Sequence, residues 1–151
     1  MAWYMERVAQ LQEILAGGGG TGTLQSEIEA NCAPTDLPGH AVYITSDKIA
    51  DKFQVTRVNI DSPNSTIAVA CGVIKEKQNS TCCTIVLFGK MDNFSGFSPG
   101  KRLFVGTGSF LEDTPPTRPP TGRRIFQEMG FVLSATEIML IPNQPVEIKP
   151  E

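Results

Sequence analysis

The sequence is poor in histidine, in excess basic charge and in long apolar runs, and each shortage excludes a class of function. His40 is the only histidine, so a His-based catalytic triad would depend on it alone. It follows a Pro-Gly turn, and we expect an ordinary surface side chain. The formal net charge is −3, which argues against a protein that binds nucleic acid through its phosphates. No apolar run approaches the roughly 20 residues of a membrane-spanning helix, so we expect no membrane partner.

The cysteines lack the spacing of a metal site. The chain has no C-x-x-C pair and too few histidines for a zinc-binding pattern. The four cysteines are Cys32, Cys71, Cys82 and Cys83. We expect free thiols in a reducing compartment, and a bridge from Cys71 to Cys82 or to Cys83 is the alternative that the sequence leaves open.

The other reactive side chains form no catalytic grouping. A thiol nucleophile at Cys82 or Cys83 would need a nearby histidine or helix N-terminus, and neither is visible. The adjacent carboxylates Glu112 and Asp113 are better explained by a solvated turn than by a cation site. We therefore expect no enzyme, no catalytic residue, no cofactor and no metal site. Charged residues among the apolar ones at the N-terminus do not fit a secretory signal, so we expect a soluble protein made in a cytosol.

What the sequence does contain is a series of short apolar runs across residues 84–141. Gly, Pro, Ser and Asn clusters separate them at roughly eight to twelve residues, a spacing typical of a small all-β sandwich or barrel. The runs are Ile85–Phe88, Leu103–Val105, Ile125–Phe126, Phe131–Leu133 and Ile138–Ile141. The sequence therefore predicts a mainly β fold, a small antiparallel β-barrel or sandwich.

Upstream of these runs the pattern is also that of strands. Residues 40–45 and 53–60 read as strands, and residues 67–74 read as a buried strand. A polar tip at 76–80 leads to the apolar run that begins at Cys82, so this run and residues 67–74 are expected to pair antiparallel. In the loop 91–99, Phe94 and Phe97 are expected to plug the core rather than form an exposed contact.

Two proline-rich segments are expected to be extended. Thr114–Thr121 carries four prolines in eight residues, which favours a stiff, polyproline-like loop. The tail 143–151 follows Pro142 and cannot pair continuously in a sheet, because prolines lack the amide hydrogen that a ladder needs. We expect it to lie along a neighbour's surface or to stay loose.

The N-terminal part reads as an arm. Residues 2–16 predict a helix whose apolar residues recur as the seam of a heptad repeat. This helix either packs on its own domain or associates with copies of itself or with a partner, because so short a helix is marginal alone. Residues 17–22 form a Gly-rich tether with about 12–15 Å of reach. The seam residues are Met1, Tyr4, Val8, Leu11 and Leu15.

The division of the chain follows from these segments. Residues 23–30 predict one or two helical turns, and the two prolines and the Pro-Gly turn of 31–39 end the arm. We therefore assign residues 1–38 to an N-terminal arm, 39–142 to a β-domain and 143–151 to an extended tail.

A succession of glycine and proline motifs resembles a known family. The motifs are Gly72-Val73, Gly89, Pro99-Gly100-Lys101-Arg102-Leu103-Phe104-Val105-Gly106, Gly108, Pro115-Pro116 and Met129-Gly130-Phe131-Val132-Leu133-Ser134. Over about residues 39–142 this succession is similar to the small decoration (cement) proteins of tailed-phage capsids. In that family a Pro-Gly turn feeds a Leu-aromatic-Val-Gly strand, and a Gly-hydrophobic-x-Leu-Ser strand precedes an apolar final strand.

The resemblance implies a structural virion protein. Such a protein would be made in the host cytoplasm, bind the outer surface of the capsid as a homotrimer and stabilise the lattice of the major capsid protein. Candidate contact residues are the helix seam and the tail, namely Tyr4, Val8, Leu11, Leu15, Val146 and Ile148. A neck, fibre or baseplate component is the alternative, and a non-viral adaptor or carbohydrate-binding β-module is the third hypothesis.

Overall fold

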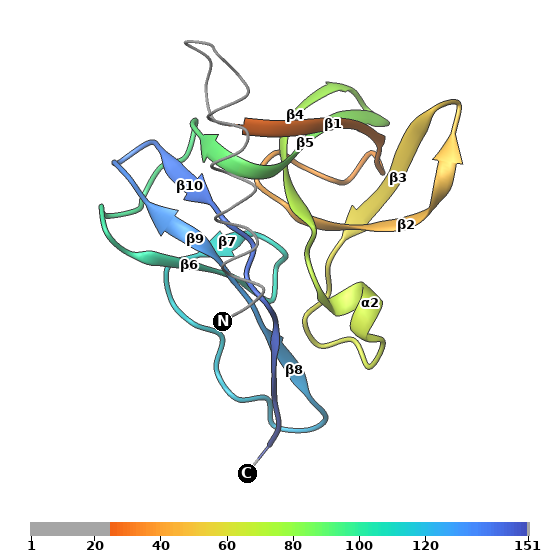
Figure 1. Ribbon diagram of the computed structural model, residues 1–151. Coiled ribbons are helices and arrows are strands. Elements are labelled where there is room, and N and C mark those ends of the chain that lie inside the picture. The colour runs from red at the N-terminus through yellow and green to blue at the C-terminus, as the bar shows by residue number, and fades with distance from the viewer. Residues whose placement is uncertain (1–24, 151) are drawn as a thin grey trace.

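The computed structural model describes residues 25–150 and shows a mainly β protein (Figure 1). Among these residues the only helix is α2 (Ser65–Ala68), so no helix there is long and apolar enough to cross a membrane. The strands are β1 (Gln25–Asn31), β2 (Ala41–Ile49), β3 (Lys52–Arg57), β4 (Gly72–Asn79), β5 (Cys82–Met91), β6 (Arg102–Val105), β7 (Leu111–Glu112), β8 (Arg124–Phe126), β9 (Glu128–Val132), β10 (Ile138–Leu140) and β11 (Val146–Ile148).

Five strands close a barrel in the order β1-β3-β2-β4-β5, and β5 returns to β1. Four of the five contacts are antiparallel, whereas β1 and β3 run parallel, with Ala30 opposite Phe53. The prediction of an antiparallel barrel is therefore corrected to a mixed one. The reason is geometric, because strand directions cannot alternate all the way around a closed ring with an odd number of strands.

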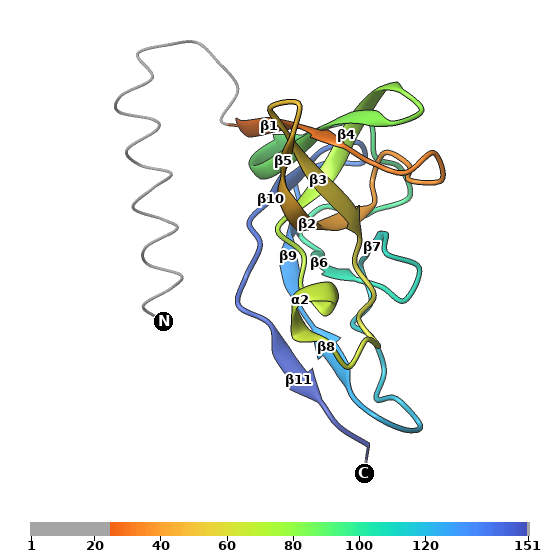
Figure 2. The same cartoon turned by 90° about the vertical axis from the view of Figure 1, so that its right-hand side faces the viewer.

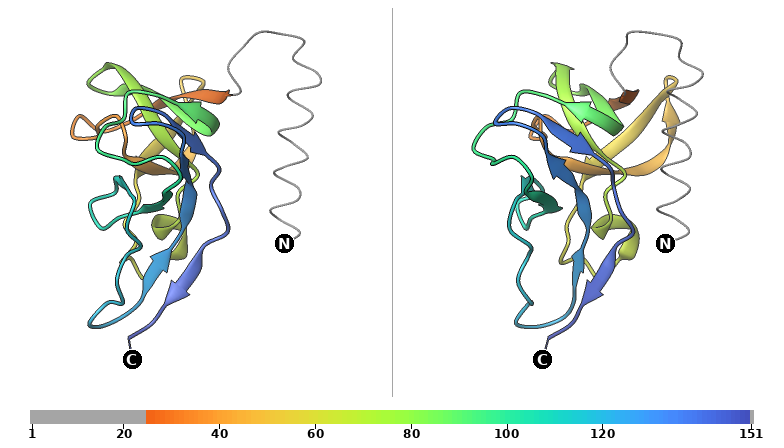
Figure 3. Two further views of the ribbon diagram at one scale, coloured as in Figure 1. Left: turned by 90° about the vertical axis from the view of Figure 1, so that its left-hand side faces the viewer. Right: turned by 60° about the vertical axis from the view of Figure 1, so that its left-hand side comes forward.

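The remaining strands extend the barrel on one side and below it. β10, β9, β6 and β7 continue the sheet from β5 in that order, and β8 pairs with β11 in a separate two-stranded sheet. Figure 2 shows β8 and β11 reaching away from the barrel as a narrow projection. The β2–β3 hairpin forms a second projection at the other end of the molecule, and Figure 3 shows both from further directions.

Two apolar clusters fill the interior. The smaller cluster lies inside the barrel and includes Ile74, Ile85 and Cys83. The larger one lies between the barrel and the β6–β9–β10 layer and includes Leu103, Met129 and Ile138 as well as other buried side chains. Burying such side chains contributes roughly 1.5–3 kcal/mol for each large aliphatic group, so this second cluster fixes the extra layer to the barrel.

Several sequence predictions are confirmed. All five apolar runs between residues 84 and 141 lie in or overlap strands, which are β5, β6, β8, β9 and β10. The antiparallel pairing of the strand before residue 80 with the one after it is the β4–β5 ladder. Phe94 and Phe97 pack against the larger core cluster, with ring centroids 6.1 Å apart.

The helical turns predicted over 23–30 are wrong for the described residues, because Gln25–Asn31 is strand β1. Its side chains alternate between exposed Glu27 and Glu29 and the more buried Ile28 and Ala30, the two-residue period of a strand. β1 pairs with β5 and β3, so the sheet includes residues that the sequence assigned to the arm. The helix 2–16 and the tether 17–22 lie outside the described residues.

The buried strand predicted over 67–74 is also wrong in its first half. Asn64 caps the short helix α2, its side-chain oxygen accepting a hydrogen bond from Thr66 N (2.9 Å). The chain then turns and enters β4 only at Gly72. A local cap therefore overrides the apolar pattern, because a side chain that bonds nearby main chain offers an alternative to the ladder.

Candidate functional site

The C-terminal tail is not loose, because residues 146–148 form strand β11. Val146 lies opposite Phe126 and Ile148 opposite Arg124 on β8. Alternation places Val146 and Ile148 on one face of β11. The structure thus brings together these two predicted contact residues, and Val146 is 59% exposed. The other four, Tyr4, Val8, Leu11 and Leu15, lie outside the described residues.

β11 has a free main-chain edge within the described residues. Ile125 N donates to Ile60 O (2.8 Å), so the main-chain groups of Ile125 point away from β11. In an antiparallel pair hydrogen-bonded and non-hydrogen-bonded positions alternate. Glu147, which lies opposite Ile125, therefore directs its own N–H and C=O to the outer edge, where a further extended segment can pair.

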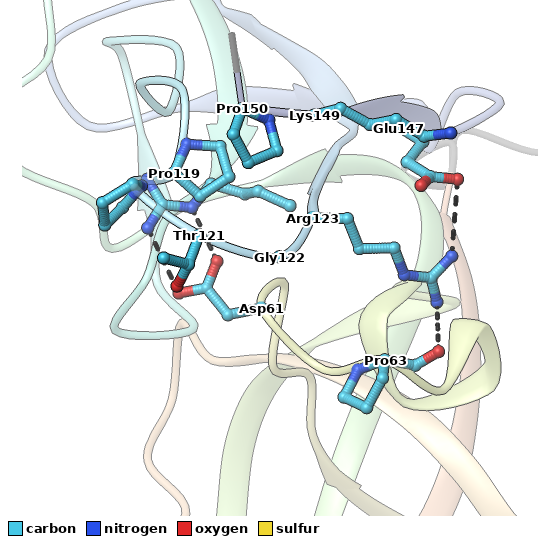
Figure 4. Close-up of a pocket in the computed structure, with 11 residues that line it drawn as sticks. Asp61, Pro63, Pro119, Thr121, Gly122, Arg123, Glu147, Lys149 and Pro150 are labelled. Atoms are coloured by element: carbon cyan, nitrogen blue, oxygen red, sulfur yellow. Dashed lines mark hydrogen bonds and ion pairs between the residues drawn. The ribbon is translucent and has the colours of Figure 1, made fainter.

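A groove of about 730 Å³ lies on the same projection, between β11 and the turn before α2 (Figure 4). It is formed by the turn before α2, the proline-rich loop before β8, and β11 with the residues after it. Its lining residues are Asp61, Pro63, Pro119, Pro120, Thr121, Gly122, Arg123, Arg124, Glu147, Lys149 and Pro150. Because proline fixes one backbone dihedral, four prolines give walls that need little ordering when a partner binds.

The two adjacent arginines hold the walls of the groove together. Arg124 makes a two-point ion pair with Asp61, with Nε–Oδ1 at 2.6 Å and Nη2–Oδ2 at 3.2 Å, and donates to Thr117 O at 2.8 Å. The hydrogen bond to Asp61 raises the pKa of Arg124 above its already high ordinary value. Arg123 donates to Pro63 O (2.5 Å) and lies 3.5 Å from Glu147 Oε2. These arginine charges are thus engaged in structure.

Two further side chains define what the groove presents to a partner. Arg118 Nη1 donates to Lys149 O (3.1 Å), which ties the proline-rich loop to the chain after β11. The Lys149 ammonium has no ion-pair partner within residues 25–150. The groove therefore offers rigid apolar walls and one available cation, a combination that suits an extended peptide with an acidic residue.

A second cavity of about 330 Å³ lies between the barrel and the loop after β5. The phenylalanines Phe94, Phe97 and Phe110 line it, and Phe110 is 40% exposed. Asp92 and Asn93 also line it and are exposed, and Asp92 interacts electrostatically with Lys75 and Lys90. This cavity pairs an aromatic wall with exposed polar groups, as many small-molecule sites do.

The prediction of a surface histidine is wrong, because His40 is 2% exposed. Its ring lies against Phe110, with centroids 4.0 Å apart, and its Nδ1 accepts a hydrogen bond from Leu37 N (2.8 Å). Burial lowers the pKa of His40, the nearby Arg57 lowers it further, and Asp36 opposes the shift. The imidazole thus closes the loop before β2 as a neutral acceptor.

All four cysteines are unpaired in the structure. Burial, strengthened by a hydrogen bond with Cys32, raises the pKa of the Cys83 thiol to about 12, and burial also raises the pKa of Cys71. Glu112 lies in strand β7 rather than in a turn. Within residues 25–150 no group of three or more His, Cys, Asp or Glu side chains is placed to hold a metal ion.

Val146 and Ile148, which the sequence suggested as contact residues, lie on the β8–β11 projection, whereas the groove was not predicted. Arg123 and Arg124 stand out in the sequence as a small basic cluster, yet Asp61, the partner of Arg124, lies 63 positions earlier, and no local pattern joins them. Only the return of β8 beside residue 60 makes the pairing possible.

Comparisons of this chain with protein-family models, with curated proteins and with solved structures give no match.

Proposed function

We propose that this protein is a structural virion protein that decorates the outer surface of a tailed-phage capsid and stabilises the lattice of the major capsid protein. The observation that carries the proposal is the β8–β11 projection, which combines a free strand edge, the exposed Val146 and a preformed proline-lined groove. A partner chain that adds a strand at this edge gains main-chain hydrogen bonds, and the groove on the same projection supplies side-chain selectivity.

The shape of the molecule supports contact with more than one partner chain. The β2–β3 hairpin projects away from the β8–β11 end (Figure 1), and it carries Ile49 (60% exposed) near its tip and Ile44 (38% exposed) along its length. Two apolar projections that point in different directions suit a protein that bridges neighbours. We assign the β11 surface to the capsid and the β2–β3 hairpin to contacts between copies in a homotrimer.

Multivalency would let such a protein attach firmly to the capsid. Once one surface has docked, the others act at high effective concentration, so weak single contacts add to firm attachment. The helix seam at Tyr4, Val8, Leu11 and Leu15 remains a candidate contact of the same kind. A neck, fibre or baseplate role uses the same surfaces but differs in copy number, which would be a handful per particle rather than close to the capsomer count.

The test is co-sedimentation with empty shells assembled from the major capsid protein of the same genome. Wild-type protein is expected to pellet with the shells to a saturating ratio. Val146→Asp places a charge in the centre of the contact and is expected to weaken binding at least tenfold, because a desolvated unpaired charge is costly.

Leu37→Asp is the matched control. Leu37 is also an exposed apolar residue (50%), but it lies in the loop before β2, far from β11 in the fold. It is expected to bind shells as wild type does. Absence of wild-type co-sedimentation, or an equal loss in both variants, would rule out the β11 surface as a capsid contact.

Carbohydrate binding is the second candidate function, and the phenylalanine-lined cavity is the observation that favours it. An aromatic wall packs against the C–H face of a sugar, while Asp92 and Asn93 are placed to bind hydroxyl groups. A glycan screen with Asp92→Ala as the comparison tests it. Binding that is lost in this variant supports the second function, and a negative screen removes it.

A further inference from the structure

A row of side chains crosses the outer face of the extra layer. Arg102 lies opposite Phe131, Phe131 opposite Met139, and Met139 opposite Lys90. Phe131 is 39% exposed and Leu133, two residues further on the same face, is 38% exposed. Arg102 pairs with Glu128 and Lys90 with Glu137, so the ends of the row are charged and its middle is apolar. We call this row with Leu133 the outer-face row.

The chain before β1 leaves the sheet directly beside this row. Gln25, the first described residue, lies opposite Gly89, Gly89 opposite Leu140, and Leu140 opposite Gly130. On β5, β10 and β9, each residue of this second row is the neighbour in sequence of a residue of the outer-face row. Adjacent strands are about 4.8 Å apart, so residue 25 is about 10 Å from β10 and about 14 Å from β9.

The expected helix 2–16 has a length that matches the outer-face row. Residues 2–16 are expected to form a helix of about 22 Å at 1.5 Å per residue, and its seam from Tyr4 to Leu15 spans about 16 Å. The outer-face row spans three strand spacings, or about 14 Å. The eight residues 17–24 reach about 14–17 Å if they behave as a Gly-rich chain. Helix, tether and row therefore fit without stretching.

Other exposed apolar side chains are less accessible to this segment. Ile49 belongs to the β2–β3 hairpin, which contacts β1 only at its far end. β1 meets β3 at Ala30, about 16 Å from Gln25 at 3.3 Å per residue, so the N-terminal segment would have to run back along all of β1 to reach Ile49. Leu37 and Val146 stand on other loops and strands and do not form a row. Within residues 25–150, only the outer-face row combines adjacency to the chain entry with several apolar side chains in register.

We propose that in the free protein the helical segment 2–16 packs its seam on the outer-face row of its own chain. A helix too short to persist alone gains a surface, and the sheet gains a cover for Phe131, Leu133 and Met139. The seam then reaches a capsid subunit or another copy only by leaving this face, so binding through the arm competes with this internal contact. The inference does not rest on the proposed function, because it concerns the isolated protein.

Trp3 is the only tryptophan in the chain and reports this contact by its fluorescence. We expect its emission maximum in the full-length protein at a shorter wavelength than that of N-acetyl-tryptophanamide, and unchanged over a wide dilution series. Phe131→Ser and Met139→Ser, each in the full chain, are expected to move the maximum toward longer wavelength. Leu37→Ser, the matched exposed control, is expected to leave it unchanged.

Three results would overturn the proposal. Emission at the wavelength of the free reference would show that the segment is uncovered. Emission that neither Phe131→Ser nor Met139→Ser moves would place Trp3 against another surface. A maximum that shifts on dilution would assign the cover to a second copy. None of these results depends on capsid binding, so failure here and failure of the proposed function are separate outcomes.

Discussion

At the scale of single residues, the buried polar side chains of this protein hold loops and strand junctions in place. Asp36, His40 and Gln127 are each at most 2% exposed, and no buried side-chain nitrogen or oxygen within the described residues lacks a hydrogen-bond partner. Asp36 and His40 each accept a hydrogen bond from a main-chain N–H three residues earlier in the same loop, whereas Gln127 bonds the main chain of Ala70, 57 residues away. Burying a polar group without such a partner is costly, so these side chains restrict which loop conformations the barrel tolerates.

His40 makes the stability of the loop before β2 depend on pH. Its folded pKa is lowered, so the unfolded chain binds the proton more readily and its stabilising contribution is present above about pH 6.5. We expect the contribution to be lost as the pH falls below that value, because imidazolium Nδ1 cannot accept from Leu37 N. Urea unfolding at pH 7.5 and at pH 5.5 measures this loss.

His40→Asn is the control for that experiment, because the asparagine Oδ1 can replace Nδ1 as acceptor and does not titrate. It is expected to reduce the difference in stability between the two pH values. His40→Ala should instead cost about 1–3 kcal/mol at pH 7.5, since the Leu37 amide is left unpaired. An undiminished pH dependence in His40→Asn would assign the titration to another group.

The side chain of Gln127 makes main-chain hydrogen bonds of the kind that a neighbouring strand would make. Its Oε1 accepts from Ala70 N (2.8 Å), and its Nε2 donates to Ala70 O (3.0 Å) and to Asn143 O (3.2 Å). Gln127→Leu keeps the volume but leaves these main-chain groups unpaired, so we expect a loss of about 2–4 kcal/mol in urea unfolding. Gln144→Leu, at an exposed position in the segment before β11, is expected to change stability by less than about 0.5 kcal/mol. Equal losses would show that the hydrogen bonds of Gln127 contribute no more to stability than an exposed glutamine does.

At the scale of elements, the β9–β10 pair depends on Gly130. Its φ is +137°, and a Cβ built there would overlap the carbonyl oxygen of Met139 on the neighbouring strand. Gly130→Ala is therefore expected to break the pairing and cost more than about 3 kcal/mol, because backbone strain and a main-chain clash add. Hydrogen exchange of the β10 amides should accelerate.

Gly108→Ala is the comparison for Gly130→Ala. No atom lies within 4 Å of a Cβ at Gly108, and its backbone is not in the left-handed region. We expect its stability to remain within about 0.5 kcal/mol of wild type. If both substitutions were tolerated equally, the close approach of β9 and β10 would not require glycine.

The elements also show what the sequence can and cannot predict. The apolar runs of β5, β6 and β9 are visible because each is continuous and bounded by turn residues. β1 was missed because Ile28 and Ala30 are only two apolar residues in a short polar segment, and what makes this segment a strand is its pairing with β5, more than fifty residues later. The burial of His40 and the Arg124–Asp61 pair were missed for the same reason, since both depend on contacts between segments distant in sequence.

At the scale of the whole molecule, closure of the barrel determines which surfaces remain for partners. β1 fills the gap between β3 and β5, so the barrel itself has no open edge. Open positions remain on β11, at the tip of the β2–β3 hairpin and on the outer-face row. In the proposals above, the seam of the arm covers the third of these positions, and β11 and the hairpin serve the capsid and self contacts.

The oligomeric state tests this division of surfaces. If the β2–β3 hairpin joins copies in a trimer, light scattering of the purified protein should give a native mass near three times the 16.4 kDa of one chain. Ile49→Asp would place a charge in that contact and should return the mass to one chain. Val146→Asp should keep the trimer mass, because β11 is assigned to the capsid. A wild-type mass of one chain would remove the trimer, and loss of the trimer in Val146→Asp alone would move the self contact from the hairpin to β11.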